Sequence, residues 1–214
     1  MFGTSMQRRT ALKRLDLEDC DISAMPMSHF LGLPRELRVF SIRNPYRRVH
    51  AYAPLLADDY IDLLREKQQS LKEITVHTSP FSSSLLGPLR LSEFPHLKRI
   101  SAVCTSLFGR EEVGPSAPYT IQNIPLQTLL PKSLEYLTIA SVWEPQHERL
   151  YPLLQQYIAV KPDAAPVLKE ITIVLDVQWP EDPAVWPSQE LKANAFRAGV
   201  RLVVEMDRNP TYGI

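Results

Sequence analysis

The chain has 214 residues, of which 44% are hydrophobic and 22% are charged, and its 24 basic residues balance its 24 acidic ones. This composition is typical of a folded, soluble protein and excludes a disordered chain, while the zero net charge disfavours broad binding to nucleic acid or acidic membranes. No apolar run approaches the roughly 18 residues that span a bilayer, and residues 1–10 lack the apolar core of a secretory signal. We therefore predict an intracellular protein, cytoplasmic or nuclear, with no nucleic acid and no membrane as partner.

One short pattern, L-x-x-[LIF]-x-[LIVA], returns along the sequence. Its six copies begin at Leu12, Leu37, Leu71, Leu97, Leu134 and Leu168, and residues 200–204 form a degenerate seventh. The last three positions of each copy predict a short strand with two apolar residues inward and one residue outward. Because one unit cannot bury its apolar side alone, neighbours must stack and pair their strands in parallel. We therefore predict an α/β fold, a right-handed solenoid with a parallel sheet of six or seven short strands on its concave face and irregular helices or loops on its convex face.

Two helices are predicted between these strands. The first follows Asp58 and Asp59, which can cap a helix start, and buries Ile61. The second contains residues 150–158, whose apolar side chains fall at helical spacing, with Pro152 in its first turn. Both helices are expected on the convex side.

A third helix and a long loop follow from capping and proline signals. The helix lies between Ser188 as its N-cap and Gly199 as its stop, with Leu191 and Phe196 buried. Residues 106–132 contain two glycines and four prolines and show no sustained periodicity. This segment is predicted to be a protruding loop.

The predicted organisation is a single repeat domain over residues 12–205, with an N-terminal extension at 1–11 and a C-terminal tail at 206–214. Four prolines support the repeat register because each lies two or three residues before a leading leucine: Pro34, Pro95, Pro131 and Pro166. The N-terminal extension is too short to form a sizeable polar cap over the end of the core. We therefore expect either a truncated chain or a buried contact at that end.

The first copy resembles the leucine-rich repeat family. The family consensus is L-x-x-L-x-L-x-x-[N/C]-x-L, and every position is matched by Leu12, Leu15, Leu17, Cys20 and Ile22. Later copies keep only the first half of the consensus and carry long, proline-rich insertions. This combination of a shortened consensus and long insertions resembles the repeat region of fungal F-box proteins.

That resemblance implies a protein-recognition function. In this family an F-box binds the adaptor of a cullin-type ubiquitin ligase, and the repeats bind the protein to be tagged. Residues 33–37 (LPREL) resemble the opening of an F-box, but residues 130–134 (LPKSL) show the same lead-in before another strand, and Leu37 already serves as a leading leucine. The F-box is therefore predicted to be missing, so the adaptor is a partner only if an F-box lies outside this chain.

Three columns of outward residues are predicted to cross the concave face. From them we predict a surface for a protein partner, made of Arg14, Asp16, Glu18, Ser41, Arg43, Glu73, Thr75, His77, Arg99, Ser101, Tyr136, Thr138, Glu170 and Thr172. The mixed signs and sizes suit a protein better than nucleic acid. The alternative explanation for the many hydroxyls is strand propensity combined with solvent exposure.

Two further features have open interpretations. Residues 35–48 form the most basic stretch, which favours a solvated loop over a contact with phosphate or an acidic peptide. His77 and Cys104 lie on neighbouring repeats, but Cys104 lies two residues past its strand and is expected to face elsewhere. The two cysteines, Cys20 and Cys104, fit neither a disulfide framework nor a zinc site.

No catalytic motif, phosphate-binding glycine loop or metal-ligand spacing is found in the sequence. We therefore predict no enzyme activity, no cofactor and no metal. The leading hypothesis is the substrate-recognition part of an F-box-type ubiquitin ligase subunit. The alternatives are an interaction scaffold without ligase ties, and an enzyme on an α/β scaffold, which would need a ligand pocket with catalytic groups at strand ends.

Overall fold

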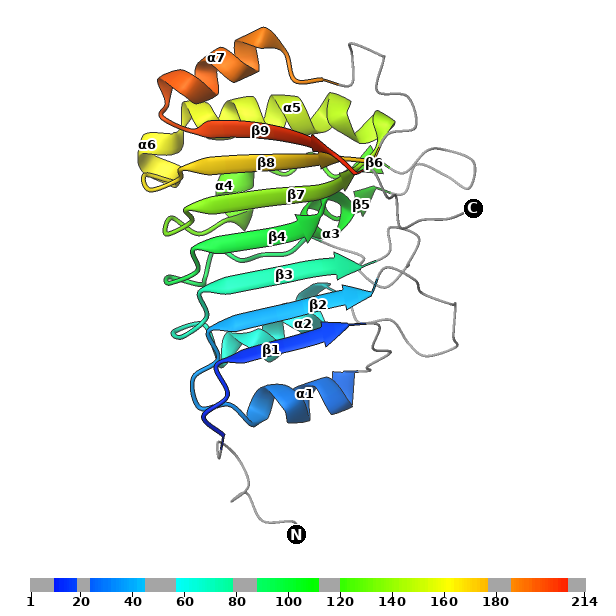
Figure 1. Cartoon of the computed structure of the whole chain (residues 1–214), viewed down its shortest axis with the longest axis vertical. Helices are drawn as coiled ribbons and strands as arrows, with labels where there is room; N and C mark the ends of the chain where they lie inside the picture. Colours follow the sequence, from blue (N-terminus) through cyan, green and yellow to red (C-terminus); the bar gives the residue numbers. More distant parts are fainter. Residues whose placement is uncertain are drawn as a thin grey trace.

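Seven strands lie side by side in the order in which they occur in the chain, and all neighbours pair in parallel (Figure 1). This computed structural model describes residues 10–18, 24–44, 57–78, 88–111, 120–176 and 186–207. The strands of the sheet are β1 (Arg14–Glu18), β2 (Val39–Asn44), β3 (Glu73–Thr78), β4 (Arg99–Val103), β7 (Tyr136–Val142), β8 (Glu170–Leu175) and β9 (Arg201–Met206). The fold is thus mixed α/β, with a seven-stranded parallel sheet and several helices.

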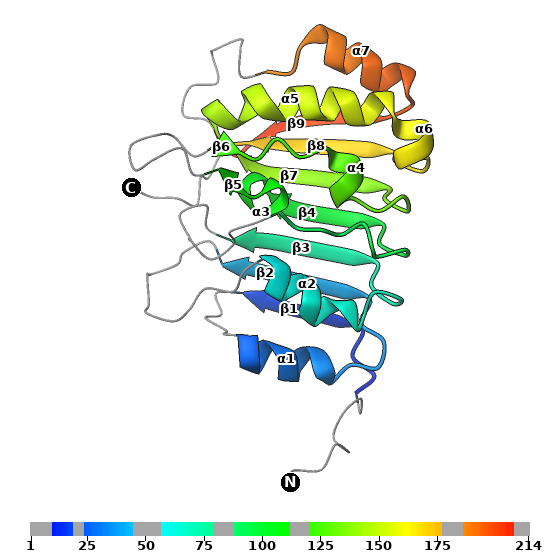
Figure 2. The same cartoon turned by 180° about the vertical axis from the view of Figure 1, so that it is seen from behind.

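Helices cover one face of this sheet. Among the described residues they are α1 (Ala24–Gly32), α2 (Ala57–Arg65), α3 (Cys104–Phe108), α4 (Leu126–Leu129), α5 (Glu144–Ala159), α6 (Lys161–Ala164) and α7 (Gln189–Arg197). Helices α2, α3, α4 and α5 lie behind the sheet in Figure 1 and in front of it in Figure 2, whereas α1 is drawn beyond β1 and α7 beyond β9. The opposite face carries no helix of the described chain, and we call it the uncovered face.

The alternating apolar residues of the repeats form the core. Strand pairing places Leu15, Phe40, Ile74, Ile100, Leu137, Ile171 and Leu202 in one continuous row across the sheet. The leading leucines pack beneath the strands, with at most 1% exposure at Leu37, Leu71, Leu97, Leu134 and Leu168. Leu12 differs because it belongs to the first repeat and is 41% exposed. The predicted strands are therefore confirmed, including the seventh.

The second predicted helix is confirmed, but its start was predicted wrongly. Helix α5 begins at Glu144, so Pro152 lies inside the helix and not in its first turn. The start is fixed by Gln146, whose side-chain oxygen accepts a hydrogen bond from the backbone N–H of Trp143 at 3.3 Å. Pro145 suits the first turn because a backbone N–H there needs no partner within the helix. The helix therefore extends well before the apolar stripe that revealed it.

Helix α7 is confirmed, but one of its two predicted buried residues is exposed. Ser188 Oγ accepts a hydrogen bond from the Leu191 backbone N–H at 3.1 Å, and Gly199 follows the helix with a φ of 67°. Leu191 and Ala195 are buried, but Phe196 is 85% exposed. Phe196 lies five residues after Leu191, which turns it roughly 140° away from Leu191 around the helix.

The first predicted helix is also confirmed with a shifted start. Helix α2 begins at Ala57, so Asp58 and Asp59 lie within its first turn and do not precede it. Ile61 is buried as predicted, and Leu64, one helical turn later, is buried with it.

The prediction of a protruding loop at residues 106–132 is wrong for its described part. This part contains the end of α3, helix α4 and two short antiparallel strands, β5 (Arg110–Glu111) and β6 (Thr120–Ile121). Its apolar side chains are buried, among them Leu107, Phe108, Ile121, Leu126 and Leu129. Residues 112–119 lie outside the described chain. The segment packs against the sheet because its scattered apolar residues join the common core.

The leading leucines allow a matched stability test. Replacing the buried Leu134 by alanine removes methyl groups from a filled core, so we expect Leu134→Ala to lower the free energy of unfolding by about 2–5 kcal/mol. The control, Leu12→Ala, alters the same repeat position where the side chain is 41% exposed, and it should cost less than about 1 kcal/mol. Urea unfolding followed by circular dichroism measures both. Equal losses would contradict the packing described above.

Candidate functional site

The three predicted columns lie together on the uncovered face. Pairing aligns the middle column, and it joins Asp16, Ser41, Thr75, Ser101, Thr138, Thr172 and Val203. The first column joins Arg14, Val39, Glu73, Arg99, Tyr136, Glu170 and Arg201. In the third column, pairing joins Glu18, Arg43 and His77 on the first three strands. It also joins Val103 of β4 to Ala140 of β7, but both of these side chains are buried. Beyond Ala140 the column is interrupted, because the pairing of β7 with β8 shifts register between Ile139 and Val142.

The middle column offers hydroxyls at different depths. Asp16 is exposed, and the threonines and Ser101 are half-buried. Ser41 is only 2% exposed, so it adds little surface to this face. The accessible part of the column therefore consists of Asp16 at one end and the residues from Thr75 toward the C-terminal strands.

Opposite charges alternate along the first column and form pairs between neighbouring strands. The Arg99 guanidinium lies 3.5 Å from the Glu73 carboxylate, and Arg201 donates to the Glu170 carboxylate. At the first strand, Arg14 donates to Asp16 at 2.5 Å. These exposed pairs contribute little stability each, and they leave the column close to neutral.

An aromatic residue lies at the middle of the same column. The Arg99 guanidinium carbon is 4.2 Å from the centre of the Tyr136 ring, within cation–π range. Lys169 approaches the same ring at 5.8 Å. Tyrosine and arginine side chains held in place in this way are the residue types that most often dominate the energy of protein interfaces.

His77 is the one histidine of the predicted surface. Its Nε2 lies 2.8 Å from Ser101 Oγ on the next strand. Burial disfavours the charged imidazolium, and nearby Arg43 repels it, so the pKa of His77 falls to about 4. The ring is therefore neutral at physiological pH. Cys104 is fully buried at the start of α3, where burial raises the pKa of its thiol, so this thiol is not poised as a nucleophile.

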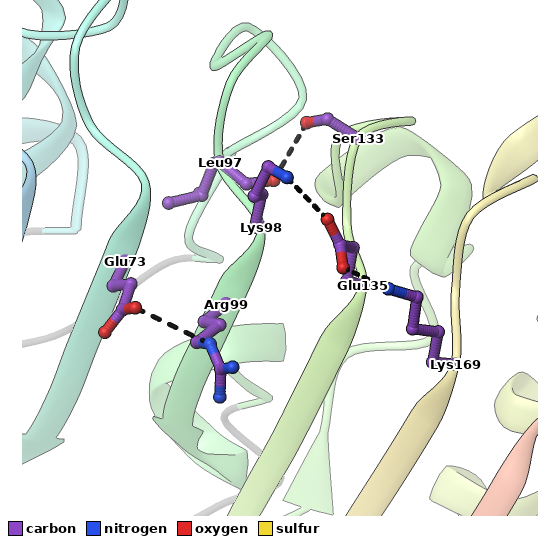
Figure 3. Close-up of polar contacts among 7 residues, drawn as sticks. All are labelled: Glu73, Leu97, Lys98, Arg99, Ser133, Glu135 and Lys169. Atoms are coloured by element: carbon purple, nitrogen blue, oxygen red, sulfur yellow. Dashed lines mark hydrogen bonds and ion pairs between the residues drawn. The ribbon is translucent and has the colours of Figure 1, made fainter.

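A charged cluster precedes the strands, and the sequence reasoning missed it. Lys98 and Lys169 donate to the two carboxylate oxygens of Glu135 at 2.7 Å and 2.6 Å (Figure 3). The carboxylate lies between the two ammonium groups, and its side chain is 16% exposed. Hydrogen bonds from Lys169 and then Lys98 lower the pKa of Glu135 to about 2. The sequence does contain a pattern that could have revealed this cluster, since Lys98, Glu135 and Lys169 each directly follow the leading leucine of successive repeat copies.

Serine side chains also join successive repeats. Ser133 Oγ donates to the carbonyl oxygen of Leu97 at 2.8 Å, as Figure 3 shows. Ser70 Oγ makes the equivalent bond to the carbonyl oxygen of Leu37 at 2.9 Å. Each serine directly precedes a leading leucine, so its position in the repeat was visible in the sequence although its role was not.

The basic stretch at residues 35–48 is only partly described. Arg38 forms an ion pair with Glu36 at 2.7 Å, and Arg43 forms one with Glu18 at 3.5 Å. Arg47 and Arg48 lie outside the described residues, as does Cys20. The described part therefore holds paired arginines.

A hollow of about 490 Å³ between α1 and α2 is lined mainly by residues 28–33 and by Asp62, Leu63 and Glu66. No group of three or more His, Cys, Asp or Glu side chains in the described ranges is placed to hold a metal ion. None of the helices there has the length and apolar character required to cross a membrane.

The buried imidazole predicts a pH dependence of stability. His77 has a folded pKa of about 4 against an ordinary value of 6.5, so the unfolded chain takes up a proton first as the pH falls. Stability is therefore lost between about pH 6.5 and pH 4, and His77→Gln should remove this part of the loss. NMR titration of the ring and urea unfolding measure the two effects.

A substitution at Arg43 tests why the pKa of His77 is lowered. Arg43→Gln should raise the pKa of His77 because it removes a nearby positive charge, whereas Arg197→Gln on α7 should leave it unchanged. A pKa for His77 near 6.5 in the unmodified protein would contradict the buried position of the ring.

The Glu135 cluster predicts a separate acid transition. Its folded pKa of about 2 lies below the ordinary 4.5, so its stabilising effect is complete above about pH 4.5 and is lost as the pH falls toward 2. Glu135→Gln should lower the urea midpoint at neutral pH and flatten the acid dependence over this range. Glu148→Gln, an exposed change on α5, should do neither. If both variants behave alike, the two lysine contacts do not stabilise the fold.

Comparison with known proteins identifies no relative of this chain. No protein-family model, no curated protein and no solved structure matches it. Its function is therefore inferred from the geometry of the uncovered face and of the edge beside it.

Proposed function

We propose that this chain is a leucine-rich repeat solenoid without catalytic activity, whose uncovered face is the concave side and binds a protein partner. One observation carries the proposal. The strands follow one another in sequence order and pair in register, so their outward residues form mixed polar columns on a face that no described helix covers. In its most specific form, the proposed role is the substrate-recognition part of an F-box-type ubiquitin ligase subunit.

The exposure of a parallel sheet supports the solenoid. Parallel sheets in ordinary α/β domains are covered by helices on both faces, and their strands are apolar throughout. Here each strand is apolar toward the helices and mostly polar on the other side, as in β8, where Ile171 and Ile173 are buried while Glu170 and Thr172 alternate with them on the other face. A stack of repeats produces this one-sided pattern because each repeat contributes one strand and covers only one face.

The chemistry of the face supports a protein as the partner. Its charges alternate and pair, so it lacks the strong positive potential that binds nucleic acid. Arg99 and Tyr136 provide a preorganised pair suited to the centre of a protein interface. Half-buried threonines around them offer hydrogen bonds without long, mobile side chains.

A second candidate function is an interaction scaffold without ligase ties. The observation that favours it concerns residues 33–37, the segment that resembles an F-box opening. Leu37 is fully buried as a leading leucine, and Arg38 continues the turn into β2. This segment therefore serves the repeat structure, and the ligase assignment rests on the family resemblance.

The test is affinity purification of the tagged protein from its native cells, with mass spectrometry of the recovered proteins. The double variant Arg99→Ala/Tyr136→Ala should reduce recovery of the direct partner at least tenfold, since losing about 1.4 kcal/mol of binding energy is sufficient. The control, Phe196→Ala/Arg197→Ala, removes an exposed aromatic residue and an arginine from α7 and should leave recovery unchanged.

The recovered proteins separate the two candidate functions. Recovery of the cullin adaptor supports the ligase subunit, and recovery of other proteins without it supports the scaffold. Equal recovery by the face variant and the α7 control would refute recognition through the uncovered face.

A further inference from the structure

The turns that lead into the strands form one edge of the sheet, at the left in Figure 1. We call the charged residues that lie from two positions before to one position after each of the six leading leucines the turn edge: Lys13, Arg35, Glu36, Arg38, Lys72, Lys98, Lys132, Glu135 and Lys169. Seven of these nine residues are cations, although the whole chain holds 24 basic and 24 acidic residues. Positive charge is therefore concentrated along this edge.

Backbone hydrogen bonds fix the edge as a continuous row. The N–H of Lys72 donates to the carbonyl oxygen of Arg38 at 2.8 Å, and Lys98 donates to Lys72 in the same way at 2.8 Å. Glu135 and Lys169 continue the series, each donating to the preceding member at 2.9 Å. Successive members therefore follow the strand spacing of about 4.8 Å, and the row does not depend on mobile loops.

The two carboxylates organise the cations without neutralising the row. Glu36 accepts hydrogen bonds from Arg38, and Glu135 accepts one from each of two lysines. A lysine ammonium has three donors, so Lys98 and Lys169 each keep donors for another acceptor. With seven cations and two anions, the row retains a surplus of positive charge.

We propose that the turn edge binds an extended, carboxylate-rich segment of a protein partner, an inference that rests on the proposed function and adds a chemical class to the partner. From Lys13 to Lys169 the row crosses six strands, or about 24 Å at 4.8 Å per strand. An extended peptide advances about 3.4 Å per residue, so a segment of about seven or eight residues matches this length. Charge complementarity then provides recognition beside the nearly neutral face.

An acidic peptide fits this row better than a nucleic acid does. Nucleic-acid sites for single strands combine cations with aromatic side chains on which bases stack. The members of the turn edge are lysines, arginines and glutamates, and its two carboxylates would repel a regular phosphate chain. A peptide can place small neutral residues opposite Glu36 and Glu135.

The test measures binding of a fluorescein-labelled peptide of about eight glutamates to the full chain by fluorescence anisotropy. The triple variant Lys13→Gln/Lys72→Gln/Lys132→Gln changes exposed members of the edge and leaves the Glu135 cluster intact. Each exposed charge pair contributes only modestly to binding, so we expect the loss of three such pairs to weaken binding about tenfold. The control, Arg90→Gln/Lys192→Gln/Arg197→Gln, removes the same charge elsewhere and should change binding less than about twofold.

The peptide-binding experiment tests the turn edge alone. Recognition through the uncovered face is tested separately, by partner capture with the Arg99→Ala/Tyr136→Ala variant. Selective weakening by the edge variant, with no binding of a glutamine peptide of equal length, supports the proposal. Absence of glutamate-peptide binding, or equal weakening by both triple variants, overturns it. Tighter edge-dependent binding of a single-stranded RNA oligonucleotide would overturn the choice of a protein segment.

Discussion

The structure depends on one constraint: a single repeat cannot bury its own apolar side. Each strand contributes two inward residues and a leading leucine, which is too little surface to exclude water alone. Stacking solves this because Leu97, Leu134 and Leu168 each pack between the neighbours before and after them and become almost fully buried. Leu12 shows the constraint at the end of the described stack, where it has a neighbouring repeat on one side only among the described residues and is 41% exposed.

The same constraint creates the candidate surface. Once the inward residues are aligned in parallel register, the residues between them must also align, because side chains alternate along a strand. Arg99, Ser101 and their partners therefore stand in columns that no local preference specifies. Cross-strand pairs such as Glu73 with Arg99 follow from this alignment, since they join residues 26 positions apart in the sequence.

Repetition explains which parts were predictable from the sequence. The strands and the alignment of the first two columns were predicted correctly because the six copies share one internal spacing and one alternation, and register follows from both. The third column was predicted to cross all six strands, but it is interrupted, and its members Val103 and Ala140 are buried. Features that occur once were predicted less well. Pro152 was assigned to a helix start because the two preceding turns of α5 lack an apolar stripe, and Phe196 was assigned to the core because a cap and a stop define a helix without fixing its inner face. Residues 106–132 form short elements whose burial depends on tertiary packing, which periodicity cannot reveal.

Side-chain charge is distributed differently on the uncovered face and on the turn edge, and the difference follows from position in the repeat. Outward residues within strands lie close to the residues on neighbouring strands, so like charges there would repel and opposite charges pair, as Glu170 and Arg201 do. At the second position of the repeats, in the turns, two lysines instead share a single carboxylate, as Lys98 and Lys169 share that of Glu135. A partner that spans both regions would be held by shape and hydrogen bonds on the face and by charge at the edge. Salt would weaken the second contribution more than the first, because exposed charges are screened over about 10 Å at 0.1 M ionic strength while desolvated contacts are screened much less.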